Sequence, residues 1–191
     1  GIADIQINNL LGIQANAIGN HEFDDGTEAF ASLISGLDDD GESIWDPAPY
    51  AEYSTPFKGT NFPYLSANLS FPADSEPLLN ALVQDSGKSP VAGTIASSVV
   101  FEENGERIGV VGATTPGLAS ITSSGGTVVT PASDNQRLSE KEIDALAAVI
   151  QPEVDALVAD GVDKIILTSH GQVFRVEVGL AERLENVDIV I

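Results

Sequence analysis

The chain has 191 residues, 42% of them hydrophobic, and a mean hydropathy of +0.08, which supplies enough apolar material for one globular domain and excludes a disordered tail. Its 29 acidic and 8 basic residues give a formal net charge of −21, which repels phosphate backbones and argues against binding to nucleic-acid polymers. The sequence has no cysteine and no apolar run of about 20 residues, so it predicts neither a thiolate metal site nor a membrane span.

The secondary structure is predicted by short apolar runs that alternate with loops and helical stretches, a pattern typical of β-loop-α units in a covered sheet. A helix is expected first, over residues 3–11. Strands are expected at residues 15–18, 64–67, 108–113, 164–167 and 187–191. Residues 99–103 predict a hairpin partner for the third of these strands, joined to it by a turn at Asn104-Gly105. The predicted fold class is therefore α/β, with mostly parallel strands and flanking helices.

Two segments between these strands have their own signals. Residues 36–63 are rich in acidic turn residues, prolines and scattered aromatics, and predict a surface insertion with little regular structure. The clearest helix begins after Ser139, where Glu142 completes a capping box, and its apolar face keeps helical spacing as far as Gly161. Pro152 lies inside this helix and is expected to kink or split it.

Polar side chains follow two of the predicted strands. Residues 17–24 read Ala-Ile-Gly-Asn-His-Glu-Phe-Asp and place Asn20, His21 and Asp24 just beyond an apolar strand, at the edge where open α/β sheets bind ligands. Gly19 leaves the backbone free to turn at this point. His170, the second of only two histidines, follows another strand and is expected at the same edge. Taken alone, Asn20 favours a turn or cap residue and each histidine favours a structural role, but together and in this order they favour a site.

The run from Gly19 to Asp24 resembles the signature of calcineurin-like metallophosphoesterases of the 5'-nucleotidase type. Residues 61–69, 107–116, 165–170 and 180–191 resemble later strands of that family, in the same order along the chain. The resemblance implies that residues 1–191 are an internal part of the catalytic domain. It would be a partial metallophosphoesterase sandwich whose first strands and last motif lie outside this sequence.

The resemblance also implies roles for individual residues. Asn20 and His170 would bind one ion of a centre that holds two divalent metal ions, and the residue types do not distinguish Zn, Mn, Mg and Ca. His21 would act as a catalytic residue that stabilises charge on the phosphate, and Asp24 would orient it. The implied reaction is attack of water on a phosphomonoester. No substrate-binding residue is predicted.

The sequence departs from the family pattern in three places. The Asp-x-His and Gly-Asp motifs that supply carboxylate ligands do not occur in it, and neither does the closing Gly-His-x-His motif, so this chain alone is expected to bind metal weakly and to turn over poorly. Ser169 separates Thr168 from His170, a shift that would turn a side chain to the opposite face inside a strand. Asn68 and Thr114 also end strands and are expected to stabilise loops.

The implied partners are a small phosphorylated substrate of the nucleotide class and the remainder of the chain's own protein, which an exposed sheet edge or apolar face would contact. The resemblance places the parent enzyme outside the cytoplasm, in the periplasm or secreted. Two other functions remain open. One is a catalytically inactive fragment or relative that binds a small ligand or a protein, and the other is a cyclic-nucleotide phosphodiesterase with the same metal centre.

Overall fold

The computed structural model describes residues 1–45 and 56–191. The elements alternate between short strands and helices along the chain. In chain order they are α1 (Ile2–Leu11), β1 (Asn16–Ala17), η1 (His21–Phe23), α2 (Thr27–Ser35), β2 (Tyr64–Leu65), β3 (Leu69–Ser70), α3 (Pro77–Ala81), β4 (Ile95–Ala96), β5 (Ser98–Glu103), β6 (Glu106–Thr114), η2 (Leu118–Ser120), β7 (Val128–Val129), α4 (Glu140–Ala159), β8 (Ile165–His170), α5 (Phe174–Ala181) and β9 (Ile189–Val190).

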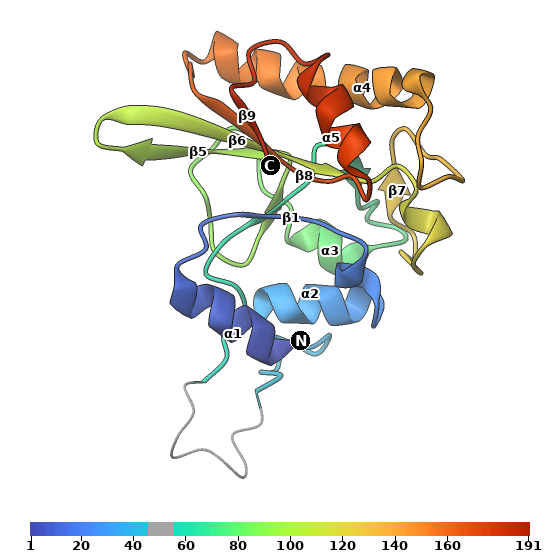
Figure 1. The fold of residues 1–191 in the computed structure, drawn as a ribbon. Helices are drawn as coiled ribbons and strands as arrows, with labels where there is room; N and C mark the ends of the chain where they lie inside the picture. Colours follow the sequence, from blue (N-terminus) through green and yellow to red (C-terminus); the bar gives the residue numbers. More distant parts are fainter. Residues whose placement is uncertain (46–55) are drawn as a thin grey trace.

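The described residues form three sheets, of which β3 and β7 make the smallest, a two-stranded antiparallel one. The two larger sheets face each other, and helices cover the outer side of each (Figure 1). One sheet has the strand order β1-β2-β4, all parallel, and the other has the order β5-β6-β8-β9, in which only β5 runs antiparallel to its neighbour. Helices α4 and α5 lie over the four-stranded sheet, while α1, α2 and α3 lie under the three-stranded one. The predicted α/β class with mostly parallel strands and flanking helices is confirmed.

Apolar side chains fill each boundary between layers. The cluster beneath α4 and α5 contains Ile143, Leu146 and Ile150, which are the helical face expected from the sequence. The cluster above α1 and α2 is aromatic, and the ring of Phe30 meets that of Tyr64 edge to face at a centroid distance of 5.1 Å. The third cluster lies between the sheets. Its buried members are Leu65, Ala96, Val99 and Val110.

The two sheets touch each other through their backbones at Gly112 on β6. The carbonyl of Gly112 accepts a hydrogen bond from the N–H of Ala67 at 2.8 Å, and its N–H donates to the carbonyl of Ser97 at 3.0 Å. A Cβ atom at position 112 would lie 2.2 Å from the carbonyl carbon of Leu65. Only glycine permits the two sheets to approach so closely at this point.

Helix α4 begins as the capping box predicts. The carboxylate of Glu142 accepts hydrogen bonds from the hydroxyl of Ser133 at 2.6 Å and from the N–H of Ser139 at 2.7 Å, and these donors lower the pKa of Glu142 to about 2. Pro152 does not split the helix, which continues to Ala159, and the alternative of a kink at Pro152 stays a prediction. Pro152 lies on the exposed side of the helix, where water can solvate the carbonyl that its missing N–H leaves unpaired.

The predicted surface segment at residues 36–63 is not exposed throughout. Phe57 and Phe62 near its end are buried in the aromatic core, because rings of this size contribute more to stability inside than on the surface. The base of the segment is closed by a hydrogen bond of 2.9 Å from the N–H of Thr60 to the carbonyl of Ile34. The insertion stays a prediction for residues 46–55, which lie outside the described part of the chain.

Strands β1 and β9 stand at the outer margins of the two sheets, each with a strand partner on one side only among the described residues. At β9 and just after it, Ile189 and Ile191 are 51% and 68% exposed. The sequence predicts such an edge. Within residues 1–45 and 56–191, no helix has the length and apolar character needed to cross a membrane.

Candidate active site

The ends of β1, β2 and β6 are tied together by buried polar side chains. Thr114 at the end of β6 donates its hydroxyl to the carbonyl of Ile18 at 2.7 Å. Asn68 and Thr114 exchange two further hydrogen bonds, from the amide of Asn68 to the Thr114 carbonyl at 2.8 Å and from the Thr114 N–H to Asn68 Oδ1 at 2.7 Å. Asn68 and Thr114 therefore stabilise the loops, and their network fixes the point from which residues 19–24 leave β1.

Gly19 is required for space. Its φ lies outside the left-handed region, so the freedom to turn expected from the sequence is not what the backbone uses here. A Cβ atom at this position would lie 3.0 Å from Cγ of the His170 ring and 3.0 Å from Oε2 of Glu22. The N–H of Gly19 donates to that same Glu22 oxygen at 2.7 Å. Glycine thus lets the ring of His170 pack directly against the loop after β1.

The structure brings Asn20 and His170 together from positions 150 residues apart in the sequence. His170 is the last residue of β8 and lies opposite Thr114 of β6, and its Nε2 is 2.9 Å from Oδ1 of the buried Asn20. Ser169 points its hydroxyl toward the carbonyl of Ile191 at 3.3 Å. The extra serine therefore does not turn the His170 ring away from the edge where Asn20 lies.

Gln172 is a third polar residue of this group, and sequence reasoning missed it. Its Nε2 lies 2.5 Å from Asn20 Oδ1 and 3.0 Å from His170 Nε2. Its backbone has a φ of 68°, which side-chain-bearing residues other than Asn and Asp seldom adopt. The one signal in the sequence is its place two residues after a candidate ligand at a strand end, since no motif marks the glutamine itself.

His21 and Asp24 form a pair on the next residues of the same loop. Nδ1 of His21 lies 2.8 Å from Oδ2 of Asp24 within the turn η1, and the imidazole is 76% exposed. The hydrogen bond from the ring to Asp24 raises the pKa of His21, and the negative charges of Asp24 and Glu22 add to the effect. The protonated form of His21 is therefore favoured beyond the ordinary range for histidine.

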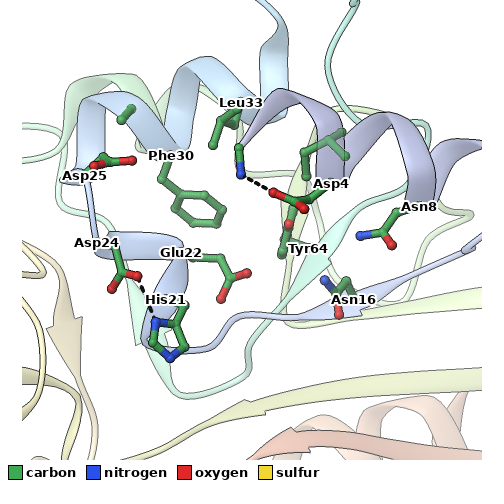
Figure 2. A pocket seen from close by; sticks show the side chains of 13 residues that line it. Asp4, Asn8, Asn16, His21, Glu22, Asp24, Asp25, Phe30, Leu33 and Tyr64 are labelled. Atoms are coloured by element: carbon green, nitrogen blue, oxygen red, sulfur yellow. Dashed lines mark hydrogen bonds and ion pairs between the residues drawn. The ribbon is translucent and has the colours of Figure 1, made fainter.

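His21 and Asp24 line a hollow of about 320 Å³, whose lining does not include Asn20 or His170. Figure 2 shows the carboxylate of Glu22 pointing into this hollow, with His21 turned toward Asp24 at its rim. Tyr64 forms part of its wall, and burial together with the charge of Glu22 raises the pKa of its hydroxyl to about 12. The acidic lining residues are Asp4, Glu22, Asp24 and Asp25. A phosphate would be repelled here unless a cation reversed the local field.

Replacing Asp24 with asparagine is expected to lower the pKa of His21 toward its ordinary value of about 6.5. An NMR titration of the imidazole Cε1–H signals measures this shift, and the variant His21→Ala assigns them because the chain has only two histidines. The raised pKa also has a consequence for stability. The stabilisation from the pair is fully present below pH 6.5 or so and is lost as pH rises through the folded pKa of His21.

The Asp24→Asn variant should therefore lower Tm more at pH 5.5 than at pH 9. An unchanged His21 titration, or a decrease in Tm of the same size at both pH values, would show that the pair does not set the protonation of His21.

The comparisons with known proteins found no matching family model. A 5'-nucleotidase of Diplobatis ommata is 33% identical over 181 residues, which are 95% of this chain. The trifunctional nucleotide phosphoesterase protein YfkN of Bacillus subtilis is 29% identical over 196 residues and matches 100% of the chain. The crystal structure of a 5'-nucleotidase precursor from Thermus thermophilus superimposes on all of the chain with a TM-score of 0.64 and 27% identity.

The chain is similar over its whole length to a segment of 5'-nucleotidases. The 5'-nucleotidase resemblance expected from residues 19–24 and the later strands is thus confirmed. The segment spans 23% of the length of the Diplobatis enzyme, 12% of YfkN and 27% of the Thermus chain. The similarity therefore concerns one part of these larger proteins, and what they do as wholes comes to this chain only as a proposal.

The 5'-nucleotidase similarity implies divalent metal ions, and the donors at the site fit part of such a centre. Among residues 1–45 and 56–191, no group of three or more His, Cys, Asp or Glu is arranged to hold a metal ion. The amide oxygen of Asn20 and the imidazole of His170 are nevertheless donors that divalent cations accept. Their separation of 2.9 Å is close to the spacing of about 3.0 Å between neighbouring ligands of an octahedral ion with bonds of about 2.1 Å.

Proposed function

We propose that the protein containing this chain is a metal-dependent phosphomonoester hydrolase of the 5'-nucleotidase type, which acts on nucleotides by attack of water on the phosphate at a two-metal centre. The observation that carries the proposal is the contact between Asn20 and His170, which the fold brings together across 150 residues. The His21–Asp24 pair lies on the residues directly after Asn20. The names of the similar proteins support the same reaction class.

Each side chain has a distinct task in this reaction. Asn20 and His170 hold a cation through an amide oxygen and a neutral imidazole nitrogen. His21, whose pKa the adjacent carboxylate raises, places a proton and a positive charge near the phosphoryl oxygens and the leaving group. Asp24 orients the His21 ring through the 2.8 Å hydrogen bond. The hydroxyl of Tyr64, with a pKa of about 12, stays protonated at neutral pH.

Divalent cations, when bound, lower the pKa of the attacking water and neutralise charge on the phosphate. The second effect matters particularly for this chain, because its net charge of −21 and the carboxylates around His21 oppose the approach of an anion. Zn, Mn, Mg and Ca all accept the oxygen and nitrogen donors that Asn20 and His170 offer.

The proposal is tested by measuring phosphate release from AMP and p-nitrophenyl phosphate with added Mn²⁺ or Zn²⁺. Activity should disappear on chelation and return with metal. His170→Ala should lower kcat/KM by about 10- to 100-fold or more, the scale of losses at metal sites. Ser169→Ala is the matched control, because this neighbour on β8 points away toward Ile191. Metal-independent activity, or equal activity of the two variants, would contradict the proposal.

Two other functions have specific support. The side chains of Asn20, His170 and Gln172 that meet here include no carboxylate, and side chains of this kind bind metal ions weakly. This supports the first alternative, a binding module for a small ligand or a protein. The name of the Bacillus relative speaks of nucleotide phosphoesters and not of monoesters alone, which supports cyclic-nucleotide phosphodiester hydrolysis as the second alternative. Assaying a cyclic nucleotide beside AMP separates these possibilities, since the binding module hydrolyses neither.

We also propose that the protein works outside the cytoplasm, in the periplasm or as a secreted form. Two names support this location. The Thermus relative is called a 5'-nucleotidase precursor, and a relative from Gloydius brevicauda, 26% identical over 187 residues, is called a snake venom 5'-nucleotidase. Fractionation of cells that express the whole protein tests the location.

A further inference from the structure

The side chains of Asn20, His170 and Gln172 form a small triangle of polar atoms. Its edges are 2.9 Å from Asn20 Oδ1 to His170 Nε2, 2.5 Å from Asn20 Oδ1 to Gln172 Nε2, and 3.0 Å from His170 Nε2 to Gln172 Nε2. All three distances lie within hydrogen-bonding range, and each of the three atoms takes part in two of the three contacts. The number of protons available at these atoms decides whether hydrogen bonds alone explain the arrangement.

Protons satisfy only two of the three edges. The edge between Asn20 and His170 needs a proton on His170 Nε2, because the amide oxygen can only accept. The edge between Gln172 and His170 needs the same nitrogen to be bare, because the Gln172 amide nitrogen can only donate. With a proton on His170 Nε2, two donors face each other at the edge to Gln172. Without that proton, two acceptors face each other at the edge to Asn20. Hydrogen bonding within the triangle is therefore frustrated in every protonation state.

A cation removes this conflict. A half-turn of the Gln172 carboxamide about its Cγ–Cδ bond exchanges its nitrogen and oxygen, since the two ends have nearly the same shape. Oδ1 of Asn20, Nε2 of His170 and Oε1 of Gln172 then all present lone pairs to one point. Resting on the proposed function, we infer that Gln172 is a third metal ligand, which shares one divalent cation with Asn20 and His170.

The lengths of the edges favour an octahedral ion. Neighbouring ligands lie about 3.0 Å apart around an octahedral ion with bonds of about 2.1 Å, but about 3.3 Å apart around a tetrahedral zinc with bonds of 2.0–2.1 Å or so. The observed edges of 2.5–3.0 Å are nearer to the shorter spacing than to the longer one. Gln172 is exposed, so water, phosphate or carboxylates could reach an ion that these three residues would hold. An ion of the Mn²⁺ or Mg²⁺ type fits best.

The loop after β8 holds Gln172 in place for this role. The N–H of Gly171 donates to Oε1 of Glu177 on α5 at 2.9 Å. A Cβ atom at Gly171 would lie 2.4 Å from the same carboxylate oxygen, so the loop and the helix are in close contact. This contact fixes the turn in which Gln172 adopts its left-handed backbone conformation and directs its side chain back toward Asn20.

The test measures binding of Mn²⁺ to the protein from the electron paramagnetic resonance signal of the free ion, which requires no catalytic activity. Gln172→Ala should weaken binding by about 10- to 100-fold. Gln172→Glu should strengthen it, because a carboxylate is a charged oxygen ligand, whereas a residue that served only as a hydrogen-bond donor would lose its function in this variant. Phe174→Ala is the control: the residue is 81% exposed, and its replacement should leave binding unchanged.

The outcomes separate this inference from the proposed function. If Asn20→Ala weakens binding while Gln172→Ala does not, Gln172 is not a ligand and the proposed metal site stands. If Gln172→Glu weakens binding as much as Gln172→Ala, the glutamine acts as a donor and the inference is overturned. If the wild-type protein binds no Mn²⁺ at millimolar concentration, both the inference and the metal-dependent function fail. Circular dichroism confirms that each variant is folded.

Discussion

Replacing His21 with alanine is expected to lower kcat for phosphomonoester hydrolysis by about 10²- to 10⁴-fold, which is the usual contribution of a positioned acid or base. The physical reason is the loss of the protonated ring that Asp24 maintains next to the loop holding Asn20. The loss should appear in kcat more than in KM if the charge acts mainly on the transition state. Steady-state kinetics with AMP in the presence of saturating metal measures both constants.

The fold should tolerate this substitution, because the imidazole is largely exposed and Asp24 is its only ion-pair partner among the described residues. Tm should therefore remain close to the wild-type value. His21→Gln serves as a second variant that keeps a polar side chain but no titratable charge, and it should be nearly as inactive. Glu28→Gln on the exposed side of α2 is the control for a change of charge nearby. Wild-type kcat in His21→Ala would remove His21 from the mechanism.

The second large effect is expected for Gly112→Ala, which should destabilise the protein by about 3 kcal/mol or more, at or above the upper end for overpacking. The new Cβ atom would lie 2.2 Å from the carbonyl carbon of Leu65, and a backbone atom cannot rotate away as a side chain can. For a chain of this size the expected decrease in Tm is roughly 6–12 °C. Thermal unfolding followed by circular dichroism measures it.

A matched control lies three residues earlier on the same strand. Gly109→Ala would place a Cβ atom 2.9 Å from Cδ1 of Leu157, the far end of a flexible side chain on α4, so a change of rotamer relieves the clash. Its cost should be about 1 kcal/mol. Equal destabilisation by the two substitutions would show that the close approach of the sheets at Gly112 is not essential. Thr114, whose hydrogen bonds hold the base of the loop that carries Asn20, lies two residues beyond Gly112 on β6. Metal binding should therefore also weaken in Gly112→Ala.

Local sequence signals predicted the longer elements well. The capping box at Ser139 and the apolar spacing after it predicted where helix α4 begins and ends. The Asn104-Gly105 turn predicted the hairpin of β5 and β6. Both signals depend only on neighbours in the chain. The pairs β3 with β7 and β2 with β4 were not predicted. These strands have two residues each, and long-range partners rather than their own sequence define them.

The site could be predicted in part for the same reason. Residues 19–24 form a continuous motif at a strand end, so Asn20, His21 and Asp24 could be proposed from the sequence. The contact between Asn20 and His170 depends on the register of β6 with β8, which places His170 opposite Thr114. Gln172 was missed because its position depends on a left-handed turn after the strand, and glutamine carries no signal for such a turn.

The margins at β1 and β9, where each strand has a strand partner on one side only among the described residues, have a consequence for how the molecule behaves in solution. Rows of unpaired N–H and C=O groups at such margins can join the sheet of another copy. Two molecules that each carry a charge of −21 resist this encounter at low ionic strength. The electrostatic range shrinks from about 10 Å in 0.1 M salt to about 3 Å in 1 M salt. The acidic surface is therefore a colloidal barrier against edge-to-edge pairing, and concentrated salt removes it while every hydrogen bond within the fold is still in place.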